Sequence, residues 1–243
     1  KHIICEKSVT TSFELAQSLL DSCKKNKIKI LEAFSFRFHP QHKKINDLVK
    51  KDFSGFNTFE GKFGFLSENK DGFRFKKNLG GSGLNDMGCY VVCASRIIFN
   101  QEPERVAAHF TIDPDTGIDI EGNFVLFFPD GKTAFGSYGY NNLYQSTYSV
   151  WGKTSLVELT RAYAIKPNID STILVHTDNG KDEIKIPWVD QTQIMIDEFS
   201  QVINSEKSPT FDYEKDLLYQ SKVLEALRLS NNENRIVHLD ELN

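Results

Sequence analysis

The 243-residue sequence predicts an α/β unit followed by a larger, mostly antiparallel sheet unit that is backed by helices. Three observations predict this fold class. A strand–helix–strand pattern opens the chain, a series of strand patterns separated by turn sequences fills its middle, and two helical patterns close it. We therefore expect α/β plus α+β architecture in one chain.

The opening unit begins with the apolar run His2–Cys5, which is too short for a helix and is typical of a buried parallel strand. Thr11 or Ser12 can cap the following helix, whose apolar residues recur at helical spacing from Phe13 to Leu20. Ile28–Phe36 is predicted to be a second strand. The proline at the end of Arg37–Pro40 marks the boundary of this unit.

The middle of the chain contains turn sequences of standard chemistry, including Pro114–Gly117, Pro129–Lys132 and Asn179-Gly180. Asn-Gly between two alternating segments predicts a hairpin. Phenylalanines at 56, 59, 63 and 65 indicate a further strand. The later strands are expected at 105–113, 118–128, 133–140, 145–151, 155–161, 173–177 and 183–186, and the closing helices at 191–204 and 212–229.

Composition excludes several classes of protein. The net charge of −4 and the absence of a long basic block argue against nucleic-acid binding. No apolar run is long enough to span a membrane, and we expect no signal peptide. The four cysteines form no CxxC pair and have no histidine at ligand spacing, which predicts no metal site and favours free thiols in a reducing cytoplasm.

The segment Gly80–Tyr90 is the most distinctive stretch, because a glycine-dense turn leads here into a predicted helix over 86–98. Asp86 and Tyr90 are four residues apart and share one helix face. A carboxylate beside a phenol is a plausible proton-transfer pair. On spacing alone, Asp86 near a helix cap with Tyr90 packed in the core is the more common arrangement.

Three motifs recur in one order: Cys5-Glu6-Lys7-Ser8, Glu32-Ala33-Phe34-Ser35-Phe36-Arg37-Phe38-His39-Pro40-Gln41 and Asp86-Met87-Gly88-Cys89-Tyr90. Together they resemble the glucose–fructose oxidoreductase / inositol dehydrogenase (Gfo/Idh/MocA) family of NAD(P)-dependent oxidoreductases. The resemblance covers essentially the whole chain. Tyr144, Tyr148, Trp151 and Gly152 look most like the nucleotide-sugar 3-ketoreductases of that family.

The resemblance implies roles for individual residues. Lys7 matches the lysine of the family's Glu-Lys-Pro motif and would stabilise a developing alkoxide. Tyr90 matches the catalytic tyrosine, and the Lys7 ammonium is expected to favour its phenolate. Asp86 would orient this pair or contact a substrate hydroxyl. Glu6, Lys7 and Arg37 are then the expected cofactor-binding residues, with NADP or NAD as cofactor, and His39 and Tyr144 the expected substrate-pocket residues.

The sequence departs from the family pattern at two points. Ser8 stands where the motif has proline, so the loop lacks a fixed φ and is expected to hold Lys7 less rigidly. No G-x-G-x-x-G fingerprint is present, and the chain opens almost at the Glu-Lys-Pro loop. We therefore expect this chain alone to be catalytically incompetent, although its parent protein is an enzyme.

The implied division is a C-terminal remnant of a Rossmann domain over 1–40, a sheet-forming substrate and oligomerisation domain over 41–210, and a C-terminal helix and tail over 211–243 that pack back on the first part. The implied reaction is reduction of a keto-sugar, possibly nucleotide-linked, by hydride transfer. Two alternatives stay open. One is a truncated, non-catalytic sugar-binding or oligomerisation module, and the other is a dihydrodiol or polyol dehydrogenase of the same family. Phe-rich strands at 56–65 and 124–135 predict a homo-oligomer, a dimer or tetramer.

Overall fold

The computed structural model describes residues 1–51, 55–67 and 70–242. Its smaller sheet pairs β1 (Ile3–Cys5) in parallel with β2 (Ile30–Glu32), and α1 (Phe13–Lys25) connects the two strands. The Ser12 side chain accepts a hydrogen bond from the Leu15 N–H and caps α1. The predicted strand–helix–strand unit is therefore present.

The larger sheet has the spatial order β10-β9-β8-β7-β3-β6-β5-β4-β11 over the described residues. Neighbouring strands are antiparallel except β3 and β6, which run parallel. The strands are β3 (Phe56–Leu66), β4 (Arg105–Ile112), β5 (Asp119–Phe127), β6 (Thr133–Gly139), β7 (Asn141–Gly152), β8 (Ser155–Leu159), β9 (Ser171–Thr177), β10 (Gly180–Ile186) and β11 (Val237–His238). The predicted fold class is confirmed.

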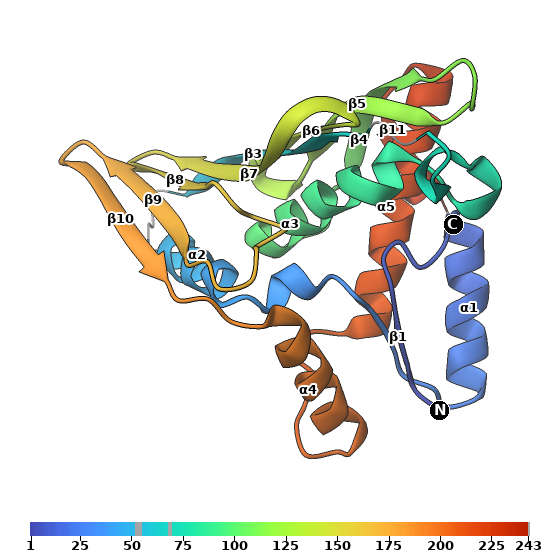
Figure 1. The fold of residues 1–243 in the computed structure, drawn as a ribbon, viewed down its shortest axis with the longest axis horizontal. Helices are drawn as coiled ribbons and strands as arrows, with labels where there is room; N and C mark the ends of the chain where they lie inside the picture. The colour runs from blue at the N-terminus through green and yellow to red at the C-terminus, as the bar shows by residue number, and fades with distance from the viewer. Residues whose placement is uncertain (52–54, 68–69, 243) are drawn as a thin grey trace.

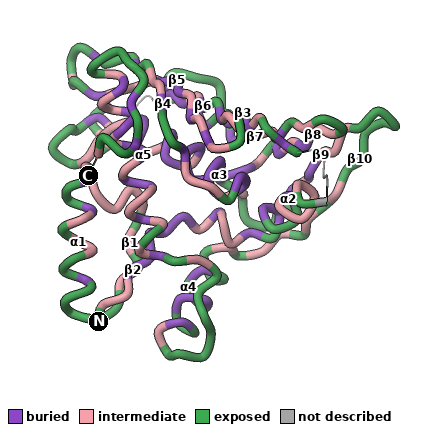
Figure 2. The backbone as a smooth tube through the Cα atoms, turned by 180° about the vertical axis from the view of Figure 1, so that it is seen from behind, coloured by how far each residue is buried: buried purple, intermediate pink, exposed green. Residues whose placement is uncertain are grey.

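Helices lie on one side of the large sheet and leave its other face uncovered (Figure 1). They are α2 (Pro40–Lys51), α3 (Cys89–Phe99), α4 (Gln191–Ile203) and α5 (Tyr213–Glu233). Most residues of α3 are buried, because it packs between β3 and α5 (Figure 2). Helix α5 contacts α1 and β2 as well as β4, so it joins the two sheets.

The core between the sheet and α3 is rich in aromatic side chains. Phe34, Phe36 and Phe63 each lie within 5.5 Å of the Tyr90 ring, measured between ring centroids. Aromatic pairs at this distance gain energy beyond the area that they bury. None of the helices in the described part of the chain combines the length and apolarity needed to cross a membrane.

The second expected strand and the helix expected at 86–98 differ from the structure. The second strand ends at Glu32, because the Phe34 N–H bonds to the Glu32 carbonyl and a 3₁₀ turn over Ser35–Phe38 follows. This turn places Phe36 fully inside the aromatic core. The helix expected at 86–98 begins earlier, with a π-helical turn over Leu84–Gly88 that runs directly into α3.

Candidate active site

Lys7, Asp86 and Tyr90 lie together, although 79 residues separate the first from the second. The Lys7 Nζ donates hydrogen bonds to the Asp86 main-chain oxygen at 2.6 Å and to its Oδ1 at 3.1 Å. The same Nζ lies 4.8 Å from the centre of the Tyr90 ring. The arrangement brings a cation, a carboxylate and a phenol to one place at the carboxyl end of β1.

Glycine is required at the turn that positions Asp86. A Cβ added at Gly81 would lie 2.5 to 2.8 Å from the main-chain oxygens of Arg74, Lys76 and Phe73. Main-chain oxygens cannot rotate away as a flexible side chain can, so a larger residue would push the turn apart. Gly80 has φ of +78°, which is the left-handed region that favours glycine.

The cap of this helical segment comes from a strand of the sheet. The carboxylate of Asp119, on β5, accepts the Leu84 N–H at 2.6 Å and the Tyr138 hydroxyl at 2.7 Å. Asp86 is therefore not the cap that its position suggested. Its side chain is free to face Lys7.

Sequence reasoning missed two partners of Asp86. The Arg74 Nε donates to Asp86 Oδ2 at 2.7 Å, and the Tyr140 hydroxyl donates to the same oxygen at 3.3 Å. The available signals were an arginine between Phe73 and Phe75 just before the glycine turn, and a tyrosine at the end of a predicted strand. Neither signal indicates a contact with Asp86 unless the fold is known.

Electrostatics keep the Lys7–Asp86 pair ionised. Burial by itself raises the pKa of Asp86, but Lys7 and Arg74 outweigh it, and the net pKa lies below its usual range. Burial likewise lowers the pKa of Lys7, and its neighbours Cys89, Tyr90 and Asp86 outweigh that effect, so the net pKa is raised. Lys7 is therefore a fixed positive charge at neutral pH.

Tyr90 behaves differently from the expectation. Burial among the aromatic rings raises its pKa well above the ordinary value, and the nearby Lys7 ammonium opposes this shift without cancelling it. Lys7 therefore favours the phenolate, as expected, but burial outweighs it and the net pKa of Tyr90 is raised. Tyr90 keeps its proton at neutral pH, which is the state that a proton donor needs.

A cavity of about 420 Å³ opens beside these groups, and we call it the reaction cavity. Its size lies within the range of small-molecule sites. Tyr90 is not among its lining residues, although its ring centre lies 4.8 Å from the Lys7 Nζ, which is at the lining. The lining residues are Lys7, Ser8, Val9, Thr11, Phe73, Arg74, Asn78, Leu79, Gly80, Gly81, Ser82, Asn85, Asp86 and Tyr140.

Hydrogen bonds hold the loop that carries Lys7 at Ser8, the position where the Glu-Lys-Pro motif has proline. The Ser8 hydroxyl donates to the Asn85 carbonyl at 3.3 Å, and the Val9 N–H donates to Glu32 Oε1 at 3.0 Å. Glu32 is 6% exposed, and its Oε2 has no hydrogen-bond partner. The loop is therefore tied both to the glycine turn and to β2.

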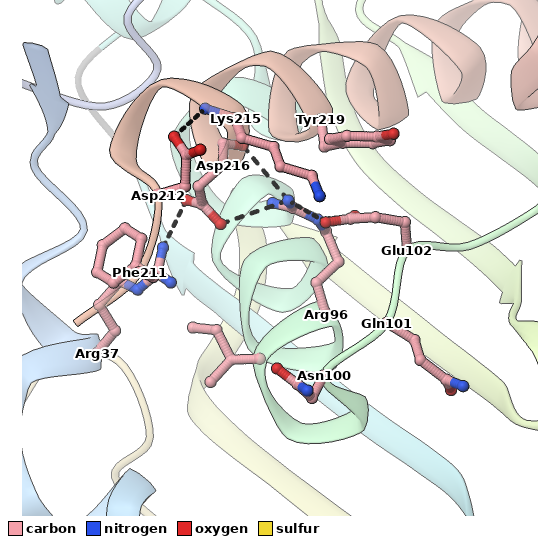
Figure 3. Close-up of a pocket in the computed structure, with 11 residues that line it drawn as sticks. Arg37, Arg96, Asn100, Gln101, Glu102, Phe211, Asp212, Lys215, Asp216 and Tyr219 are labelled. Carbon is pink, nitrogen blue, oxygen red and sulfur yellow. Dashed lines mark hydrogen bonds and ion pairs between the residues drawn. The ribbon is translucent and has the colours of Figure 1, made fainter. Parts of the chain in front are cut away.

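Arg37 does not approach Lys7. Its Nη1 donates to Asp216 Oδ2 at 2.5 Å, and its guanidinium stacks on Phe211 at 3.5 Å from the ring centre (Figure 3). Arg96 reaches the same carboxylate from α3 and also pairs with Glu102. The structure thus uses Arg37 to join the turn after β2 to α5, and its charge is already paired.

The remaining predicted residues lie outside the reaction cavity. His39 is 1% exposed, and burial lowers its pKa to about 4, so it is a neutral core residue. Tyr144 lies in the exposed first half of β7. Glu6 is exposed beside Lys7 and does not line the cavity. Within the described ranges, no group of three or more histidine, cysteine or acidic residues could hold a metal ion.

The assembled groups can do one kind of chemistry well. A protonated phenol beside a fixed ammonium can give a proton to an oxygen that becomes negative, while the ammonium stabilises the charge as it develops. Lys7 follows the carboxyl end of a parallel strand pair, which is where open α/β sheets bind ligands, and Tyr90 lies beside it on α3. The fold and this site define a carbonyl-reducing or alcohol-oxidising class of protein.

Comparison with known proteins finds a family model and curated relatives that match this chain. Residues 44–158 match the model of the GFO/IDH/MocA C-terminal domain. D-xylose 1-dehydrogenase (NADP(+)) 2 of Haloferax volcanii is 26% identical over 98% of this chain and 73% of its own length. dTDP-3,4-didehydro-2,6-dideoxy-α-D-glucose 3-reductase of Actinomadura kijaniata is 24% identical over 94% of this chain and 69% of its own. The chain thus matches the C-terminal domain of the Gfo/Idh/MocA family in its middle and is similar to these two oxidoreductases over nearly its whole length.

A solved structure supports the same fold. The aldose–aldose oxidoreductase of Caulobacter crescentus, in complex with glycerol, superposes with a TM-score of 0.89 at 24% identity. The match covers 98% of this chain and 72% of that one. The two-sheet arrangement described above is therefore one that solved proteins adopt.

Proposed function

We propose that this protein is an NAD(P)-dependent oxidoreductase that reduces a keto-sugar, with Lys7, Asp86 and Tyr90 around the reacting oxygen. The observation that carries the proposal is the Lys7 ammonium, which Asp86 fixes next to the ring of Tyr90. Two relatives that align with more than nine-tenths of the chain are named as oxidoreductases of sugars, which favours a sugar over a dihydrodiol.

The residues at the end of β1 fit the nicotinamide end of such a cofactor. Lys7 leaves the carboxyl edge of the parallel pair with its charge directed into the site, and Glu6 is exposed next to it. These two residues would hold that end of the cofactor. Arg37 does not fit the role, because its guanidinium is engaged by Asp216 and Phe211.

The chemistry that the bound cofactor supplies is a hydride for the carbonyl carbon. As this carbon is reduced, its oxygen gains negative charge, which the Lys7 ammonium stabilises. The Tyr90 hydroxyl gives its proton to that oxygen, and an alcohol results. Asp86 keeps Lys7 charged and in place, while Arg74 and Tyr140 hold the carboxylate of Asp86.

Steady-state reduction of keto-sugars by the full protein tests these roles. Tyr90→Phe removes the proton donor, and Lys7→Met removes the charge while keeping most of the side-chain length. Each variant is expected to lower kcat by roughly a hundredfold, the usual cost of losing a positioned acid or base. Lys166→Met, at an exposed position in the loop between β8 and β9, is the matched control. Rates near wild type in both site variants would reject the assigned roles.

We also propose a division of the chain around this site. Residues 1–40 belong to the cofactor domain, 41–210 form the sheet domain, and 211–243 return to the first part. The contacts of α5 with α1 and β2 support this division. Four free cysteines, three of them buried, support a reducing, cytoplasmic location.

We propose, finally, that the protein self-associates through the uncovered face of the large sheet. Strand pairing places Trp151 and Phe135 on this outer face, where they are 61% and 46% exposed. Neighbouring residues on the face, such as Glu60 and Lys62, are polar. Large exposed rings beside polar residues are typical of an interface between copies.

A further inference from the structure

Arg74 lines the reaction cavity with most of its hydrogen-bonding capacity unused. A guanidinium carries five N–H donors in a rigid, planar arrangement. The Nε–H of Arg74 donates to Asp86 Oδ2 at 2.7 Å, and its Nη1 and Nη2 groups donate to no acceptor within the described residues. The side chain is 39% exposed. The donors of both Nη groups therefore remain available at the wall of the cavity.

Three contacts hold the Arg74 guanidinium in place. Besides the Asp86 carboxylate, the rings of Phe73 and Phe65 lie against it, with their centres 5.0 and 5.6 Å from Arg74 Cζ. Such cation–π contacts stabilise an arginine without occupying its N–H donors. A donor that is fixed before a ligand arrives loses less conformational entropy on binding than a free side chain does. Arg74 is therefore a pre-organised donor.

Asp86 is less suited to bind a substrate hydroxyl, which is one of the roles that the resemblance implied for it. Its Oδ1 accepts a hydrogen bond from Lys7, and its Oδ2 accepts from Arg74 and Tyr140. The Lys7 Nζ has two of its three donors engaged by Asp86, which leaves one donor for the reacting oxygen. Of the charged groups at the cavity, Arg74 therefore has the most donors to spare.

Several polar side chains of the cavity are engaged in holding its walls. The Ser8 hydroxyl donates to the Asn85 carbonyl at 3.3 Å, and the Asn85 amide donates to the Gly80 carbonyl at 3.3 Å. The Ser82 hydroxyl accepts the Asn85 N–H at 3.1 Å. These bonds shape the glycine turn, whereas the Nη groups of Arg74 are left for a ligand.

The position of Arg74 relative to Lys7 indicates which ligand atom it would meet. The two cations bind different oxygens of the same Asp86 carboxylate, so they lie on neighbouring sides of it. A carbonyl oxygen that meets Lys7 therefore has the guanidinium nearby. Along a sugar ring, the next ligand atom that can accept a hydrogen bond is the oxygen on the adjoining carbon. Paired N–H groups of one guanidinium suit such closely spaced oxygens.

We propose that Arg74 binds the oxygen on the carbon next to the reacting carbonyl, so that the protein selects α-hydroxy ketones over simple ketones. This inference rests on the proposed function for the placement of the reacting oxygen beside Lys7. Arg74 is then a specificity-determining residue of the reaction cavity, in addition to its contact with Asp86.

Binding of two ring ketones that differ by a single hydroxyl tests the inference without cofactor or turnover. 2-Hydroxycyclohexanone carries the neighbouring oxygen, and cyclohexanone lacks it. Titration of the purified full protein, followed by NMR of the ligand, gives a Kd for each ketone. The hydroxy ketone is expected to bind about tenfold more tightly, because it gains a hydrogen bond to a charged donor. Equal affinities, or no binding of either ketone, would overturn the inference.

Arg74→Lys is the diagnostic variant, because lysine keeps the positive charge and can still pair with Asp86 but lacks the guanidinium donors. The ratio of the two affinities is expected to fall from about tenfold to about twofold, through weaker binding of the hydroxy ketone alone. Tyr140→Phe is the matched control, because it removes another donor to the same oxygen of Asp86 and leaves Arg74 in place. It is expected to keep the wild-type ratio.

Two results with these variants would also overturn the inference. If Arg74→Lys keeps the wild-type ratio, Arg74 does not bind the neighbouring oxygen. If Tyr140→Phe lowers the ratio as much as Arg74→Lys does, the effect runs through Asp86 and not through a contact between Arg74 and the ligand.

Binding and hydride transfer are measured separately, so the failure of this inference differs from the failure of the proposed reaction. A protein that prefers the hydroxy ketone through Arg74 but reduces no ketone refutes the reaction and keeps the contact. A protein that reduces keto-sugars but binds both test ketones equally keeps the reaction and refutes the contact.

Discussion

Asp86 accepts hydrogen bonds from three side chains that reach it from different parts of the chain, namely Lys7, Arg74 and Tyr140. Two cations around one carboxylate leave a surplus positive charge next to the reaction cavity. That surplus suits an oxygen that becomes negative during reduction. The carboxylate thus places the charge, while Tyr90 holds the proton.

Glu32 has a separate effect, which appears in the pH dependence of stability. Burial raises its pKa to about 7 from an ordinary 4.5, and the Val9 N–H only partly opposes this shift. Because the folded chain binds this proton more tightly than the unfolded chain, Glu32 contributes stability below about pH 4.5. That contribution is lost as the pH rises toward 7.

Glu32→Gln should therefore gain stability relative to wild type as the pH rises from 5 to 8, by on the order of 2 kcal/mol. Urea unfolding of both proteins at the two pH values measures this difference. The amide oxygen can still accept the Val9 N–H, so the loop is retained. Burial lowers the pKa of His39 and His42, so these two residues make stability rise with pH, opposite to the effect of Glu32. Their contribution is the same in both proteins and therefore cancels in the difference between them. The same stability difference at pH 5 and pH 8 would contradict the assignment.

For individual residues of the candidate site, the sequence predicted those that belong to a recognisable motif and missed those that do not. Lys7, Asp86 and Tyr90 come together as the resemblance implied, although their roles stay predictions. Arg74 and Tyr140 were missed, because what defines them is a contact made only after the glycine turn has folded. Arg37 and His39 follow a strand end as pocket residues do, but tertiary packing buries or pairs them.

Among the elements, the large sheet was the most predictable, because the residue types in its turns are ones that form turns between strands. Asn179-Gly180 lies at the junction of β9 and β10 as expected, and the strands on both sides of Pro129–Lys132 pair with each other. The parallel pairing of β3 with β6 was not predictable, since strand patterns do not specify partners. The π-helical turn at Leu84 depends on Asp119, which lies 35 residues away.

The uncovered outer face of the large sheet leads to a prediction about self-association. Trp151→Glu places a charge among the exposed rings of this face and should convert an oligomer into monomers, because burying an unpaired charge is costly. Light scattering at working concentration measures the change. Ile196→Glu, on the exposed side of α4, is the matched control and should leave the mass unchanged. A monomeric wild type, or a Trp151→Glu variant of unchanged mass, would argue against this interface.

For the whole molecule, the two sheets and the long helix between them form one frame for the site. Lys7 comes from the small sheet, while Asp86 and Tyr90 come from the helical segment that covers the large one. Helix α5 contacts both parts and so fixes their separation. The sequence predicted both units and the order in which they occur, but the position of one relative to the other depends on packing between α5, α1 and β4.

The central claim is that this protein reduces a carbonyl carbon with a hydride. Incubating the full protein with NADPH deuterated at the hydride position and a panel of neutral and phosphorylated keto-sugars tests it most directly. Mass spectrometry of the products is expected to show one deuterium on the carbon that bore the carbonyl, and the label should appear roughly a hundredfold more slowly with Tyr90→Phe. Folded protein that transfers no label to any of these sugars, from either NADPH or NADH, would contradict the account.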